Sequence, residues 1–214
     1  MGLGLGSAFI GRWADRQRHP VRALAGLHVA VGLALAAAYL VADRLPFVFA
    51  WLIASTSFGV DAILVCQFVL ACLTLLPMTF LLGGTFPLTM RVVTADVSGV
   101  ARDVGNTYAL NTVGAIIGSF LSGFVILPTL GLQKGIFASG AFELAIAALL
   151  FLVAPALPRR RAWAGAGGAL ALVGLALLLP RWDLTRFSSG FFRISIAKDY
   201  VERQSQKKSW STPQ

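Results

Sequence analysis

The sequence predicts an all-α, polytopic transmembrane helix bundle, and three observations predict it. Hydrophobic residues make up 57% and charged residues 13% of the 214 residues, against roughly 45–50% and 25% in soluble domains. The mean hydropathy is +0.78. Apolar runs recur between short polar segments, and a run of about 20 residues crosses a bilayer core as a helix. We expect about five full spans, a partial first helix and a short, largely unstructured C-terminal tail.

The N-terminal segment, residues 1–10, is apolar and glycine-rich but too short to span a bilayer. We expect the end of a helix whose beginning is absent, and Gly2 and Gly6 have the small-xxx-small spacing of a packing helix. The next span covers residues 23–42, and His28 lies about one turn inside its cytoplasmic end. A lone histidine there is more typical of a hydrogen bond between helices than of a proton relay.

Two apolar stretches follow that do not have the form of a simple span. Residues 46–61 are short and broken by polar residues, which predicts an interfacial or re-entrant segment. Residues 62–90 are longer than one straight span requires. Pro77, Gly83, Gly84 and Pro87 predict a kink or a change of direction in their second half. Carbonyls freed at a kink need new hydrogen-bond partners, so the kinked segment is a candidate for lining a binding site. Packing strain is the simpler explanation for the kink.

The span expected at residues 106–130 carries a face of small and amide side chains. The members repeat at i, i+4, i+7 and i+11; they are Asn111, Ala115, Gly118 and Ser122. Such a face allows a neighbouring helix to approach closely and gives an amide a hydrogen-bond partner. We expect this helix to pack inside the bundle.

The span expected at residues 135–157 contains a carboxylate, Glu143, at about one third of its depth. A carboxylate inside a membrane indicates a functional site and requires a partner. We expect that partner on the preceding span, from Asn106, Asn111 or Tyr108. A structural hydrogen bond and a proton or substrate role both remain open, and Glu143, Asn111 and His28 are the candidate intramembrane site.

The last span is expected at residues 162–180, where the run GAGG favours helix packing over a nucleotide loop because no strand precedes it. Residues 181–214 then change composition and lack the apolar surface for a core of their own. Taken together, residues 1–180 form the predicted transmembrane domain and residues 181–214 its tail.

The formal charge of +9 is concentrated in basic clusters between or beyond the apolar runs. This distribution is typical of cytoplasmic loops and contacts with anionic lipid, so the bilayer is the expected partner. No aromatic residues alternate with a basic strip, and we expect no nucleic-acid partner. The two histidines and two cysteines have no metal-ligand spacing, so no metal is expected.

The loop between the first two helices has a partial family resemblance. Gly11-x-x-x-Asp15-Arg16 resembles the loop between the second and third helices of major facilitator transporters, although Gln17-Arg18-His19-Pro20 replaces the glycine and second arginine pair that usually follow. The resemblance implies that Asp15 and Arg16 latch a helix end on the cytoplasmic side. A solvated loop with an incidental ion pair is the alternative.

A second resemblance covers nearly the whole chain. The motifs GRWADR, LLPMTFLLGGTFPLTMR and GNTYALNTVGAIIGSFLSGFVILPTLGL are followed by PRWDLTRFSSGFFR just after the last span. In this order they resemble membrane-fused spermidine synthase homologues, whose multi-helix domain precedes a polyamine aminopropyltransferase domain. In that family a Trp-Asp, a Ser-Gly and an aromatic-Arg open the soluble domain; here they are Trp182-Asp183, Ser189-Gly190 and Phe192-Arg193.

The resemblance implies aminopropyl transfer from decarboxylated S-adenosylmethionine to a polyamine acceptor in the parent protein. The glycine-rich turn and catalytic aspartate that this reaction needs do not occur after Pro180. We therefore expect no catalytic, cofactor-binding or metal residue in this chain. It would be an inactive membrane fragment that anchors the parent in the cell membrane, in particular the bacterial inner membrane, beside the parent's other helices and a candidate second copy. The alternatives are a major-facilitator-like transporter or transporter remnant, and a purely structural anchor.

Overall fold

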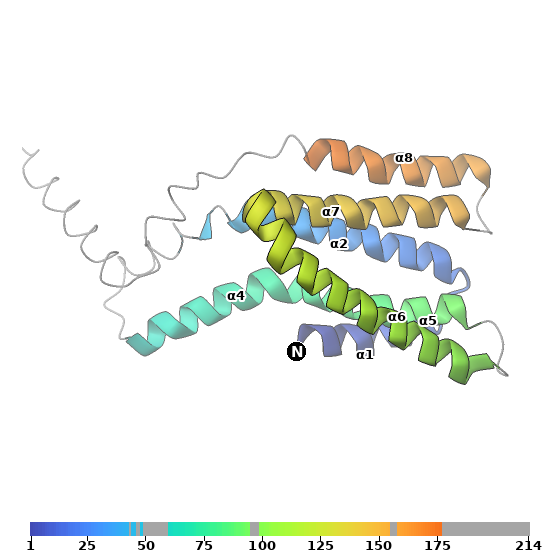
Figure 1. Ribbon diagram of the computed structural model, residues 1–214, viewed down its shortest axis with the longest axis horizontal. Helices are drawn as coiled ribbons and strands as arrows, with labels where there is room; N and C mark the ends of the chain where they lie inside the picture. Colours follow the sequence, from blue (N-terminus) through green and yellow to red (C-terminus); the bar gives the residue numbers. More distant parts are fainter. Residues whose placement is uncertain (43, 46–47, 49–59, 95–98, 155–157, 177–214) are drawn as a thin grey trace, which may run out of the picture. The chain divides into compact units, whose positions relative to one another are not determined.

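The computed structural model describes residues 1–42, 44–45, 48, 60–94, 99–154 and 158–176. These residues form helices and no strand (Figure 1), which confirms the all-α prediction for this part of the chain. The predicted re-entrant segment at 46–61 lies almost entirely outside the described residues, and the tail at 181–214 lies wholly outside them. The elements are α1 Gly2–Ala14, α2 Pro20–Ala42, α4 Val60–Gly83, α5 Thr85–Val93, α6 Val100–Phe120, the π-helical η2 Leu121–Ile126, α7 Leu127–Val153 and α8 Arg159–Ala176.

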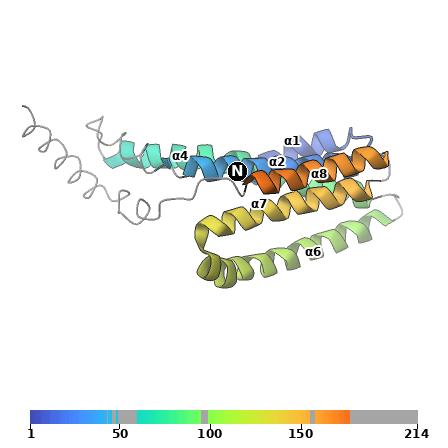
Figure 2. The same ribbon diagram turned by 90° about the horizontal axis from the view of Figure 1, so that it is seen from above.

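Three stretches are long and apolar enough to cross a membrane: Pro20–Ala42, Leu64–Val93 and Val100–Val153. The third stretch, of 54 residues, turns back on itself, so that α6 and α7 form a helical hairpin (Figure 2). These stretches are compatible with a membrane protein. The number of crossings stays a prediction.

The chain divides into two compact units. One contains residues 1–39 and 75–179 and holds every residue discussed in the sections below. The other contains residues 40–74 and 180–214. Its described part is mainly the first half of α4, in which Cys66 and Cys72 are free, half-buried thiols.

The apolar run expected to kink is interrupted at Gly84, between the end of α4 and the start of α5. The Gly84 N–H donates to the Leu81 carbonyl, and the Thr85 hydroxyl donates to the Leu82 carbonyl at 2.7 Å. The Leu81 and Leu82 carbonyls at the end of α4 thus have hydrogen-bond donors at the break between the helices. The helix is interrupted inside the segment where a kink is predicted. The kink itself and its role in lining a site stay predictions.

The turn between the predicted spans 106–130 and 135–157 contains Gly131, whose backbone angles are φ 74° and ψ 172°. This conformation is essentially restricted to glycine, because a Cβ would collide with the backbone. Gly131 therefore redirects the chain into the main part of α7.

Helix α1 packs closely on the end of α4 through two glycines. Gly2 and Gly6 are both buried. A Cβ at Gly6 would lie 1.8 Å from the Phe80 carbonyl oxygen, and one at Gly2 would lie 2.0 Å from Thr79 Oγ1. The glycines thus allow backbone-level contact, as the small-xxx-small spacing predicts.

Helix α8 packs on α7 along a seam of small residues. Ala166 and Ala169 of α8 cluster with Ala147 and Ala148 of α7, and a Cβ at Gly165 would lie 2.9 Å from the Phe151 ring. The first two residues of the GAGG run therefore lie in a helix–helix contact, as expected for a packing helix.

Helix α6 differs from its prediction. It buries no residue, Asn111 is exposed, and a Cβ at Gly114 or Gly118 would meet nothing within 4 Å. Small residues permit close approach but supply no attraction of their own, so the sequence pattern does not compel packing. Within the described residues, the expected packing face has no neighbour.

We predict that Gly6→Ala destabilises the folded chain by about 1–3 kcal/mol, because the added methyl group must displace the backbone at Phe80. Gly4→Ala is the matched control, since nothing lies within 4 Å of a Cβ there, and it should be neutral or slightly stabilising. Unfolding in mixed detergent micelles measures both. Equal stabilities of the two variants would refute the close α1–α4 contact.

Candidate functional site in the α2–α7 interface

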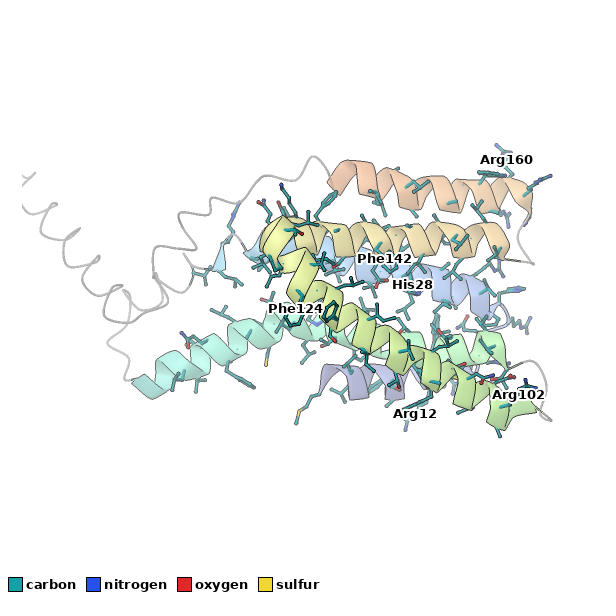
Figure 3. The ribbon with its side chains drawn as sticks, in the orientation of Figure 1. Arg12, His28, Arg102, Phe124, Phe142 and Arg160 are labelled. Atoms are coloured by element: carbon teal, nitrogen blue, oxygen red, sulfur yellow. The ribbon has the colours of Figure 1, made fainter. Side chains whose placement is uncertain are left out.

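Two of the predicted site residues meet between α2 and α7. His28 Nδ1 lies 2.6 Å from Glu143 Oε2, and the side chains are only 14% and 18% exposed. In Figure 3, His28 lies on α2 where it runs beside α7, near the labelled Phe142. The partner of Glu143 is thus His28.

The expectation of a partner on the preceding span was therefore wrong. Tyr108 packs its ring edge-on against Phe86 of α5, with 5.8 Å between ring centroids. Asn111 and Asn106 are exposed and make no hydrogen bond through their side chains within the described residues. Because α6 lies apart from α7 beyond the turn, none of the three reaches Glu143.

Four contacts between α2 and α7 come from one face of α2. His28, Gly32, Leu35 and Tyr39 repeat at i, i+4, i+7 and i+11, which places them in a line along one side of a helix. Their neighbours on α7 are, in the same order, Glu143, Leu144, Gly140 and Gln133. From His28 to Tyr39 on α2 the partners run from Glu143 back to Gln133 on α7, so the two helices are antiparallel.

Glycines bring the two helices close in the middle of this face. A Cβ at Gly32 would lie 2.8 Å from the Leu144 side chain, and a Cβ at Gly140 would lie 3.8 Å from that of Leu35. Close helix axes shorten the distance that side chains must cover. This is what lets the short imidazole of His28 reach Glu143 directly.

A second polar pair lies further along the same face. Gln133 Nε2 donates to the Tyr39 hydroxyl at 2.6 Å. Eleven helical residues separate His28 from Tyr39, a rise of about 16 Å. The α2–α7 interface is thus held by two polar contacts spaced along its length. Sequence reasoning missed this pair, although the alignment of Tyr39 with His28 and Gly32 on one helix face was a usable signal.

The His28–Glu143 contact can hold a proton in more than one way. Either Nδ1–H donates to the carboxylate, or a protonated carboxyl donates to the ring nitrogen. The Nε2 atom of His28 has no hydrogen bond within the described residues, so the ring has a free position for a further proton. The pair therefore can gain or lose a proton, or offer a carboxylate to a cation, inside an apolar bundle.

The predicted cytoplasmic latch is not formed by side-chain contacts. The Asp15 backbone N–H donates to the Gly11 carbonyl at the end of α1. Both the Asp15 and Arg16 side chains are exposed, and neither makes an ion pair or hydrogen bond within the described part of the chain. The latch stays a prediction.

Basic residues mark one end of the bundle. Figure 3 places Arg102, at the start of α6, and Arg160, at the start of α8, at the same end, where Figure 1 also shows the α1–α2 connection. This grouping is the one expected for the cytoplasmic side of a membrane bundle.

No family model, curated protein or solved structure matches the chain. No group of three histidine, cysteine or acidic side chains that would hold a metal occurs among the described residues.

We predict an energetic coupling between His28 and Glu143. His28→Ala and Glu143→Ala should each destabilise the chain by about 1–3 kcal/mol, because each leaves the other polar group unpaired in an apolar site. The double variant should cost less than the sum, by about 0.5–2 kcal/mol. Unfolding of the four proteins in mixed micelles measures the coupling.

The matched control is the same cycle with Asn111→Ala in place of His28→Ala. Asn111 is exposed on α6, so its effect should add to that of Glu143→Ala without coupling. A coupling for Asn111 as large as that for His28 would show that the pairing is wrong.

Proposed function

We propose that the chain is the membrane domain of a spermidine synthase-like protein and that its task is to anchor the parent in the cell membrane. The observation that carries this proposal is a helical bundle with three membrane-length stretches that bears the family-like motifs in order. GRWADR lies at the end of α1, LLPMTFLLGGTFPLTMR crosses the α4–α5 break, and the longest motif covers most of α6, η2 and the start of α7.

In this proposal the chemistry belongs to the parent and not to this chain. Aminopropyl transfer uses decarboxylated S-adenosylmethionine as co-substrate and a polyamine as acceptor. The chain supplies no catalytic residue. Its partners are the lipid bilayer, the parent's other helices and a candidate second copy, with no nucleic acid. The predicted compartment is the bacterial inner membrane, crossed several times.

The test is the genomic sequence on both sides of the codons for residues 1–214, followed by an assay of the whole gene product. We expect a downstream glycine-rich strand-to-helix turn with an acidic residue and a catalytic aspartate. We also expect the membrane fraction to transfer aminopropyl groups to putrescine, whereas residues 1–214 alone do not. A downstream domain of another kind, or a gene product without this activity, would contradict the proposal.

A second candidate function is transport, and the His28–Glu143 pair is the observation that favours it. A structural anchor needs no titratable pair in its core, and a carboxylate in a membrane span is costly unless it is used or paired. In a transporter, Glu143 would exchange a proton or a cationic solute, with His28 holding the carboxylate in position and receiving the proton.

For the transport hypothesis we predict that Glu143→Gln abolishes solute-driven proton movement in vesicles containing the chain, because the amide cannot take up or release the proton. The matched control is Asn111→Ala, which removes an exposed amide and should leave flux unchanged. Fluorescent pH indicators inside the vesicles report the movement while a panel of organic cations is added outside. Flux that is the same in Glu143→Gln and in the natural chain would leave the pair with a structural role only.

A further inference from the structure

The connection between α1 and α2 forms a basic cavity that the proposed function does not use. Its volume is about 510 Å³, within the range of roughly 300–1,000 Å³ that is common for small-molecule sites. It is far larger than a single water or ion requires. The lining residues are Trp13, Arg16, Gln17, Arg18, His19, Arg22 and Ala23.

The cavity carries an uncompensated positive charge. Three arginines line it and no acidic residue does. The Arg16, Arg18 and Arg22 guanidinium groups make no ion pair or hydrogen bond within the described residues. Arginine remains charged at any physiological pH, so three positive charges share one hollow whose lining contains no acidic side chain.

The start of α2 adds to this positive field. The His19 carbonyl accepts from the backbone N–H groups of Arg22 and Ala23, so the first turn of this 23-residue helix lies at the cavity wall. That turn contains no acidic residue. The amino-terminal end of a helix dipole attracts anions, and here it acts together with the three side chains.

The cavity also lies at one end of a membrane-length helix, where a membrane surface is expected. Helix α2 coincides with the membrane-length stretch Pro20–Ala42, and the cavity residues are those that precede its first turn and form it. Trp13 is 47% exposed, and tryptophan is enriched where apolar core and headgroups meet. A ligand in this cavity would therefore have its charged group at headgroup depth.

We propose that the α1–α2 cavity binds a phosphate group carried by a small organic anion, such as a glycerol phosphate headgroup. Guanidinium groups pair with phosphate oxygens through two parallel hydrogen bonds, and three of them surround the hollow. The volume leaves room for the glycerol part, and Trp13 supplies an apolar wall. Two sources offer this chemistry: an anionic phospholipid and a soluble phosphate ester.

The experiment is calorimetric titration of the whole chain in a nonionic detergent with three probes. Dihexanoyl phosphatidylglycerol represents the anionic lipid, and glycerol phosphate represents the soluble ester. Dihexanoyl phosphatidylcholine is the control, because its phosphate is already paired with a cation in the same headgroup. We expect one site per chain for the first probe and weaker binding of the third. Binding of glycerol phosphate with similar affinity identifies the soluble ester as a sufficient ligand; binding of the lipid alone identifies the lipid.

The matched variants remove the same charge from two places. Arg16→Gln, Arg18→Gln and Arg22→Gln together should weaken binding about 100-fold. A second triple variant combines Arg159→Gln, Arg160→Gln and Arg161→Gln in α8, where all three arginines are exposed. It should bind as the natural chain does, because those arginines line no part of this cavity. Far-UV circular dichroism checks that both remain helical.

Two outcomes would overturn the proposal. One is equal weakening in both triple variants, which would mean general attraction to a basic surface. The other is no saturable binding of either phosphatidylglycerol or glycerol phosphate to the natural chain.

Discussion

Glu143 lies in an apolar span, and a bilayer core offers its carboxylate no hydrogen-bond donor except those that the protein supplies. His28 supplies the partner, with Nδ1 2.6 Å from Glu143 Oε2. This requirement fixes more than a single bond, because it sets the rotation of α2 and α7 about their own axes. Once His28 faces Glu143, helical geometry brings Gly32, Leu35 and Tyr39 onto the same side of α2. The second hydrogen bond, from Gln133 to Tyr39, holds that rotation at the far end.

Elsewhere in the bundle, small residues replace polar pairs as the means of contact. α1 meets α4 through glycine, and α8 meets α7 through alanine, so dispersion contacts over a short distance hold these helices. α6 shows that small residues allow a neighbouring helix to approach closely but do not attract one. Its Thr112 and Ser119 hydroxyls donate to carbonyls of their own helix, so neither requires a neighbour, and the glycine-bearing face has no neighbour among the described residues. Only an interface that must satisfy a polar group is specified strongly.

Sequence alone predicts the helical class, the break at Gly84 and the packing glycines of α1, because apolar run length and glycine spacing are local signals. It also identifies His28 and Glu143 separately, since each is a polar residue inside an apolar span. Their pairing could not be predicted, because they are 115 residues apart and periodicity does not say which helices are neighbours. Asn111 was the more attractive partner for Glu143, since the two spans are consecutive, and the turn that holds α6 away from α7 leaves no local signature that favours His28 instead.

The central claim is that α2 and α7 lie side by side with the His28–Glu143 face between them. Disulfide formation tests it directly. A Cβ at Gly140 lies 3.8 Å from that of Leu35, within the range of about 3.5–4.5 Å found in disulfides. In a chain whose native cysteines are serines, Leu35→Cys with Gly140→Cys should crosslink within the monomer under mild oxidation in membranes. Leu33→Cys with Gly140→Cys should not, because Leu33 is 48% exposed and lies off the interface. Absence of the first crosslink, or equal yields for both pairs, would contradict the account.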